Sequence, residues 1–430
     1  MPAGSSPRPA SPSGPAGAVH PADPVHLAVA LDGAGWHPAA WREPRARPDE
    51  LLRAGYWAGL VRDAERGLLD FVTIEDDLGR GSPRTDRVRG RLDAVLIAAR
   101  IAPLTSYIGL MPTVVVTHTE PFHISKAIAT LDYVSGGRAG VRVKVSADQR
   151  EAAHFGRRTL PPVRLAGRAG PAVADLIDGL FDEAAEYVEV VRRLWDSWED
   201  GAEIRDVTTG RFADRSKLHY IDFTGTHFSV KGPSITPRPP QGQPVVGALA
   251  HASVPYRLVA GSADIGFVTP RDAGQARAIV AEIRDMQRAA GRAAEPVHVF
   301  GDLVVFLDGT AGDGTAGSGT AGDGTAVSGA DRKARLDELA GREIPSDAVI
   351  FTGTATALAD LLEDWRSAGL SGFRLRPGVL PDDLTAIVTR LVPELQRRGL
   401  FRLGYEARTL RGLLGLPRPA NRYAAAGSQR

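Results

Sequence analysis

The sequence predicts a (β/α)8 barrel, an α/β fold in which eight parallel strands alternate with helices. From Val25 onward, short β-rich runs alternate with longer helical patterns, and eight such pairs can be counted. The length of 430 residues suits one barrel with insertions. An open doubly wound sheet would need a glycine-rich fingerprint after the first strand, which residues 31–35 (LDGAG) match poorly. The barrel is therefore the favoured architecture.

Each expected strand is a short run rich in β-branched and aromatic residues. The eight runs begin at residues 26 (HLAVAL), 71 (FVTIED), 108 (IGLMPTVVV), 140 (GVRVKVS), 244 (PVVGALA), 265 (IGFVTP), 297 (VHVFGDLVVFL) and 372 (GFRLRP). Helical patterns between them cover 50–66, 91–101, 122–134, 183–198, 273–290 and 356–368. Because the active site of such a barrel lies at the C-terminal ends of its strands, side chains at those ends are the functional candidates.

The clearest helix-to-strand junction is the run 121–146, PFHISKAIATLDYVSGGRAGVRVKVS. Apolar residues recur there at helical spacing, Gly136 and Gly137 supply a left-handed stop, and valines then alternate with charged residues. If the valines face the helices, Arg142 and Lys144 point into the barrel, and the same alternation places Glu75 inside it. A lone buried cation costs several kcal/mol. We therefore expect Glu75 to pair with Arg142 or Lys144.

Four segments lie outside the regular barrel pattern, whose body we place at 25–423. Residues 1–24 are rich in Pro, Gly, Ser and Ala and are expected to be disordered, and 424–430 form a short tail. Residues 201–240 hold aromatic and turn residues and predict a small β-rich insertion near the rim. Residues 309–330 contain imperfect TAG(D/S)G repeats, typical of a flexible surface loop.

Composition excludes several classes of function. The 52 basic and 51 acidic residues nearly cancel, so no field attracts nucleic acid or an anionic membrane. No apolar run approaches the roughly 20 residues of a membrane span, and the first residues lack the core of a secretory signal, so a cytoplasmic protein is expected. The absence of cysteine excludes disulfides, thiolate metal sites and a cysteine nucleophile. His219, His227 and His251 lack metal-ligand spacing, and we expect no metal site.

Several segments resemble a known family. They are AERGLLDFVTIEDDL at 64, THTEPFHISKAIATLDYVSGGRAG at 117, EYVEVVRRLWDSW at 186 and VPELQRRGLFRLGYEARTLRGLLGLPRP at 392. Together they resemble the bacterial-luciferase-like flavin-dependent monooxygenases, in the branch of the nitrilotriacetate and dibenzothiophene-sulfone monooxygenases. The resemblance runs from Val25 to Tyr423. It implies a homodimeric or homotetrameric barrel that takes reduced FMN from a separate flavin reductase and oxygenates a small organic substrate with O2.

The resemblance also implies site residues, although it assigns no catalytic one. Positions that match cofactor contacts are Asp76, Thr117, His118, Arg142, Ser146, His251, Ala252 and Ser253. Candidate substrate contacts are Trp36 and His37, which follow the first strand where the family places substrate-side residues. Glu75 stands where the family usually has a small residue, and it is a further candidate substrate contact.

The chain departs from the family pattern at three places. Where the family reads GRAGWNVVTS, this chain reads GRAGVRVKVS, so Arg142 replaces an asparagine expected near the flavin. The family's QAGSS phosphate loop reads ALAHA at 248–252, and its HxxRY motif before the fourth helix reads IDGLF at 177–181. Two alternatives therefore stay open. One is a deazaflavin (F420)-dependent hydride-transfer oxidoreductase, and the other is a barrel that has lost its cofactor and acts as a binding protein.

Overall fold

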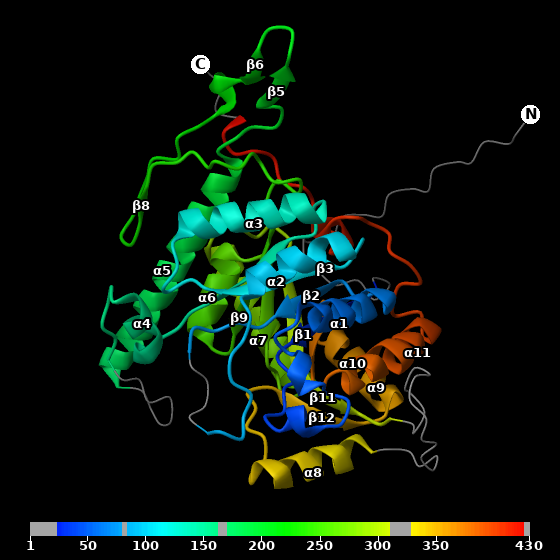
Figure 1. Cartoon of the computed structure of the whole chain (residues 1–430). Helices are drawn as coiled ribbons and strands as arrows, with labels where there is room; N and C mark the ends of the chain where they lie inside the picture. Colours follow the sequence, from blue (N-terminus) through cyan, green and yellow to red (C-terminus); the bar gives the residue numbers. More distant parts are fainter. Residues whose placement is uncertain (1–23, 80–83, 162–169, 310–327, 425–430) are drawn as a thin grey trace, which may run out of the picture.

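The structure, a computed structural model, describes residues 24–79, 84–161, 170–309 and 328–424, which form a closed parallel barrel surrounded by helices (Figure 1). The barrel strands are β1 (His26–Leu31), β2 (Phe71–Ile74), β3 (Gly109–Val115), β4 (Gly140–Lys144), β9 (Val245–Ala250), β10 (Ile265–Val268), β11 (His298–Leu307) and β13 (Gly372–Pro377). Pairing of β10 with β11 closes the barrel. All eight strands lie where the sequence predicts them, so the (β/α)8 fold is confirmed.

The outer layer consists of helices that pack on the strands. The helices are α1 (Ala54–Arg66), α2 (Ala94–Ile101), α3 (Pro121–Ser135), α4 (Gln149–Phe155), α5 (Pro171–Asp196), α6 (Ser253–Ser262), α7 (Ala273–Ala289), α8 (Gly329–Ala340), α9 (Ala355–Ser367), α10 (Asp382–Ala386), α11 (Val392–Arg397) and α12 (Leu410–Leu413). None of those in the described part of the chain is long and apolar enough to cross a membrane.

Helix α5 and strand β12 are among the elements that differ from the sequence prediction. Helix α5 begins at Pro171, whereas the sequence predicts a start near residue 183. The first turns were not predicted because they are largely exposed and carry no apolar stripe. Residues 177–181 therefore lie inside this helix and not before it. Strand β12 (Val349–Gly353) was not predicted, and it pairs with the second half of β11, outside the barrel.

The barrel interior has two layers of different chemistry. The lower layer is apolar and includes Phe71, Met111, Phe267 and Phe300, and the C-terminal segment closes it from below with Leu410, Leu414 and Leu416. The upper layer is ionic and contains Glu75 and Arg142. Val141 and Val143 belong instead to the large core between strands and helices, which confirms the predicted alternation on β4.

The 201–240 segment contains two small antiparallel pairs. They are β5 (Glu203–Asp206) with β6 (Arg211–Ala213), and β7 (Phe223–Thr224) with β8 (Ser229–Val230). This segment leads from the end of α5 to the start of β9, so it lies at the N-terminal ends of the strands, at the opposite end of the molecule from α8 (Figure 1). The predicted disordered segment 1–24, loop 309–330 and tail 424–430 fall almost wholly outside the described residues.

Candidate active site

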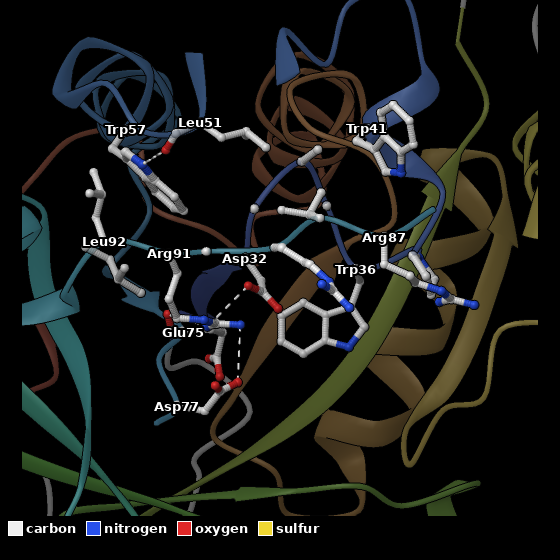
Figure 2. Close-up of a pocket in the computed structure, with 18 of the residues that line it drawn as sticks. Asp32, Trp36, Trp41, Leu51, Trp57, Glu75, Asp77, Arg87, Arg91 and Leu92 are labelled. Carbon is white, nitrogen blue, oxygen red and sulfur yellow. Dashed lines mark hydrogen bonds and ion pairs between the residues drawn. The ribbon is translucent and has the colours of Figure 1, made fainter. Parts of the chain in front are cut away.

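A cavity lies beyond the C-terminal ends of β1 and β2, where (β/α)8 enzymes carry their active sites (Figure 2). Its volume is about 540 Å³. Leu51, Trp57 and Leu92 form one side, and Trp36, Trp41 and Arg87 lie on the other (Figure 2). Asp32, Glu75, Asp77 and Arg91 line the wall between them. The cavity therefore combines an apolar side with a strongly charged wall.

Trp36 is held at the cavity wall by its backbone. Gly35 has φ +128°, and a Cβ atom there would lie 2.5 Å from the carbonyl oxygen of Gly378. This close approach lets the Trp36 amide donate to the Pro377 carbonyl at 2.8 Å. The indole ring then lies over Arg376, whose Cζ is 4.9 Å from the ring centroid. The structure thus places Trp36, a predicted substrate contact, at the cavity.

His37 is buried and makes contacts that anchor the loop after β1. Its Nε2 lies 3.1 Å from Asp337 Oδ1 on α8, and its Nδ1 accepts a hydrogen bond from the Ala39 amide at 3.0 Å. Both ring nitrogens are therefore engaged within the protein. Its role as a substrate contact stays a prediction.

Glu75 and Arg142 form the ion pair that the sequence predicts. Arg142 also donates from Nε to Thr113 Oγ1 at 3.0 Å, and Arg374 reaches the other oxygen of Glu75 at 3.1 Å. Burial alone would raise the pKa of Glu75, but Arg142 and Arg374 hold it below its usual range. Glu75 lines the cavity, whereas Arg142 lies beneath it with 3% of its side chain exposed. Cofactor contact by Arg142 remains a prediction.

The ionic layer continues from the barrel interior to the rim. Asp302 on β11 pairs with both Arg374 and Arg376 of β13. Arg376 in turn contacts Asp347 at 2.6 Å, and Asp347 lies 3.3 Å from Nε2 of His251. Charges buried in this way are tolerated because each has a partner of opposite sign. His251, a predicted cofactor contact, therefore lies beside Asp347, the outer end of a chain of ion pairs that leads to the barrel centre.

Asp76 faces helix α2 and not the cavity. Its carboxylate accepts hydrogen bonds from the amide of the next residue, Asp77, and from the amide of Ala94, the first residue of that helix. Burial raises its pKa, and these two hydrogen bonds oppose the rise. The predicted cofactor role of Asp76 is not tested by this geometry.

Thr117, His118 and Ser146 gather at the ends of β3 and β4, beside a separate small cavity of about 40 Å³. Thr117 Oγ1 accepts from the Ser146 amide at 2.9 Å, which joins the two strand ends. His118 stacks on Phe155 with ring centroids 5.4 Å apart. Its Nε2 is buried and has no hydrogen-bond partner among the described residues. Burial and the charge of Arg158 lower the pKa of His118, so the ring is neutral at pH 7.

Ala252 and Ser253 begin helix α6 at the end of β9. Ala252 is the N-cap and makes no side-chain hydrogen bond, so it leaves the first-turn amides of α6 uncapped. Ser253 Oγ donates to Glu282 Oε1 at 2.5 Å. Backbone N–H groups at such a helix start can bind a phosphate.

Several cavity residues were not among the predicted ones. Arg91 bridges Asp77 at 3.2 Å and Asp32 at 3.6 Å (Figure 2). Burial raises the pKa of Asp32, and Arg91 opposes the rise. Asp32 directly follows β1, and Asp77 follows β2 after Glu75 and Asp76, so their positions near strand ends could have marked them. Arg87 and Arg91 come from a loop without periodicity. The described residues contain no group of three or more His, Asp or Glu suited to a metal ion.

Comparison with known proteins identifies the family. Residues 36–371 match the family described as Luciferase-like monooxygenase. The chain is also 31% identical to N-acetyl-S-(2-succino)cysteine monooxygenase of Bacillus subtilis (strain 168), over 93% of this chain and 98% of that protein. The chain belongs to the luciferase-like monooxygenase family. This luciferase-like monooxygenase is equally similar to nitrilotriacetate monooxygenase component A of Aminobacter aminovorans, at 31% identity with the same coverage.

Solved structures of other monooxygenases share the fold of this luciferase-like monooxygenase. EDTA monooxygenase from Chelativorans sp. BNC1 superposes with a TM-score of 0.73 at 24% identity, covering 92% of this chain and 99% of that one. Long-chain alkane monooxygenase gives 0.75 at 23% identity, covering 91% and 96%. The resemblance noted from the sequence is thereby confirmed, and this luciferase-like monooxygenase is an oxidoreductase of the monooxygenase class.

Proposed function

We propose that the protein is a two-component flavin monooxygenase, which uses reduced FMN from a separate flavin reductase to oxygenate a small organic substrate with O2. Near-full-length similarity to two named monooxygenases carries this proposal. One of them is named as component A, which designates one part of a system with more than one component. This supports a partner protein that supplies the reduced flavin.

Features at the C-terminal ends of the barrel strands fit a flavin mononucleotide. The amides at the start of α6 suit a phosphate, because the N-cap Ala252 makes no side-chain hydrogen bond to them. The buried Nε2 of His118 lacks a partner and is available to a polar edge of a ligand. The cavity beside Trp36 is large enough for an organic ring system. The proposed contacts are therefore Ala252, Ser253 and His118 for the cofactor, with Trp36 and Glu75 for the substrate.

When bound, reduced FMN would supply the activation of O2, which no side chain of this chain provides. The protein contributes orientation and protection from water. Trp36 and Trp57 cover opposite sides of the cavity with apolar surface (Figure 2). Glu75 stays ionised because Arg142 and Arg374 neutralise it. Asp32, with its raised pKa, holds a proton more readily than an exposed carboxylate.

Anaerobic titration of the full chain tests the proposal. Oxidised FMN, reduced FMN and reduced F420 are added in separate experiments, and binding is followed by absorbance and fluorescence. We expect reduced FMN to bind more tightly than oxidised FMN and to be reoxidised by O2 at a rate that the protein changes. Binding of F420 alone would indicate hydride transfer instead. Binding of none of the three would leave a barrel without a cofactor.

A further inference from the structure

Helix α8 contacts the loop after β1 from outside the cavity. Trp36, His37 and Trp41 of this loop line the cavity, and none of the described lining residues belongs to α8. The backbone fixes the first part of the loop, where the amides of Trp36 and His37 donate to the carbonyls of Pro377 and Gly378. The part that carries Trp41 is joined to α8 by side chains.

Three polar contacts make this junction: His37 with Asp337 at 3.1 Å, Glu43 with Arg335 at 3.0 Å, and Arg42 with the carbonyl of Leu339 at 3.0 Å. The pair of His37 and Asp337 is the most buried of the three, with 0% and 12% of the two side chains exposed. Lys333 and the amide of Ile344 donate to the Asp337 carboxylate at 2.6 Å and 2.8 Å. Asp337 is therefore a fixed acceptor for the imidazole.

The contacts of His37 assign its proton. Nδ1 accepts a hydrogen bond from the Ala39 amide at 3.0 Å, so the neutral ring carries its hydrogen on Nε2 and donates it to Asp337. A second proton, on Nδ1, would face the Ala39 N–H group, which can only donate. The junction thus requires an uncharged ring, and Asp337 holds both its tautomer and its orientation.

The surroundings of His37 favour this uncharged ring. Burial lowers its pKa, Asp337 opposes the fall, and the charges of Lys333 and Arg87 add to it. Phe306 of β11 packs against the ring, with centroids 6.1 Å apart. Because the folded pKa lies below the unfolded value of about 6.5, the ring is neutral at pH 7 and takes up a proton only as the pH falls below that value.

We propose that Asp337 is a positioning residue of the substrate site: through His37 it holds the loop that carries Trp41, and so it sets how far this indole wall lies from the opposite side of the cavity. Trp57 lies on that opposite side (Figure 2). Asp337 acts from behind the loop and does not line the cavity itself. This inference rests on the proposed function, because that function makes the cavity a substrate site.

Tryptophan fluorescence of the full chain tests the role of Asp337, with acrylamide as the quencher. A Trp41→Phe variant of each protein identifies the part of the signal that belongs to Trp41. We expect Asp337→Ala to shift the Trp41 emission to longer wavelength and to increase its quenching, because the loop is no longer held against α8. Glu338→Ala, at the next and exposed position of the helix, removes the same charge and should change neither quantity.

A pH profile separates positioning from general support of the fold. In the wild type, the Trp41 signal should change in one step below about pH 6.5, as His37 takes up a proton. Asp337→Ala should give the low-pH signal at every pH. His37→Gln, whose amide can donate to Asp337 but does not titrate, should recover part of the wild-type signal and lose the step.

Two results would overturn the proposal: equal Trp41 signals of Asp337→Ala and Glu338→Ala, or a pH step that persists in His37→Gln. If Asp337→Ala does not fold, Arg335→Ala breaks the neighbouring contact from an exposed position and should give a smaller shift in the same direction. An unshifted Trp41 signal in that variant would likewise count against the proposal.

Reduced FMN is titrated in parallel, because the proposed cofactor contacts lie at the ends of β3 and β9 and not on this loop. Asp337→Ala should bind reduced FMN as the wild type does. A loss of FMN affinity in this variant would place the role of Asp337 at the cofactor and overturn its assignment to the substrate side. A protein that binds no flavin but keeps the His37-dependent step would refute the proposed function and leave Asp337 as the residue that positions the cavity wall.

Discussion

Glu75, directly after β2, and Arg142 on β4 form an ion pair inside the barrel although β3 lies between these two strands. Arg142 fixes the pair by a second hydrogen bond to Thr113 on that intervening strand. Arg374 holds Glu75 from the other side. These contacts tie four of the eight barrel strands together through side chains, just below the proposed substrate cavity.

Arg142→Ala is expected to lower the free energy of unfolding by about 3–5 kcal/mol, because it leaves a buried carboxylate with one cation fewer. Denaturant unfolding followed by circular dichroism measures the change. This loss of unfolding free energy should exceed the loss of FMN-binding free energy. The resemblance to flavin enzymes, which makes Arg142 a cofactor contact, predicts instead that FMN binding suffers more than stability. A variant that unfolds like the wild type but no longer binds FMN would make Arg142 a cofactor contact after all.

His118→Phe should separate stability from binding. Phenylalanine keeps the stacking on Phe155 and removes a buried nitrogen that has no partner. We expect the melting temperature to be unchanged or higher, because no unsatisfied polar atom remains. FMN binding should weaken if His118 contacts the cofactor. Fluorescence titration and thermal melting of the same preparations measure both quantities, and unaltered FMN affinity would exclude His118 from the cofactor site.

Gly35→Ala is expected to destabilise the protein and disturb the cavity. The new Cβ would collide with the Gly378 carbonyl in a backbone conformation that alanine rarely adopts. Trp36 should then move away from Arg376, which a change in tryptophan fluorescence would report. Gly55→Ala in α1 is the matched control, because its Cβ meets nothing within 4 Å. The control should gain about 0.5–1 kcal/mol of stability. Equal melting temperatures of the two variants would contradict the prediction.

Asp264 predicts a defined pH dependence of stability. Burial alone would raise its pKa, but Arg192 and Arg411 hold it at about 2. Because the folded pKa lies below the unfolded one, the stabilisation is complete above about pH 4 and is lost as the pH falls toward 2, amounting to about 2.5 kcal/mol. Urea unfolding at pH 5 and pH 2.5 measures it. Asp264→Asn should reduce the difference in the free energy of unfolding between the two pH values. An equal difference in the wild type and the variant would contradict the prediction.

The strands and the inner ion pair could be predicted because they follow from local rules. Alternation fixes which residues of β4 face inward, and the cost of a lone buried cation requires a partner for Arg142. Strand β12 was not predicted, because it pairs only with the second half of β11 and lies outside the eight-strand repeat. The cavity wall could not be predicted either. Its form depends on contacts such as Trp41 with Asp86, 45 residues apart, and His37 with Asp337, 300 residues apart, and no periodic pattern encodes them.

The leucines of the C-terminal segment give the barrel a closed floor, formed by Leu410, Leu414 and Leu416. Molecules that reach the strand ends must therefore enter and leave by the same side. In the proposed function, cofactor, oxygen and substrate would all approach from the C-terminal ends of the strands, and the hydrophobic seal at the far end of the molecule would touch none of them.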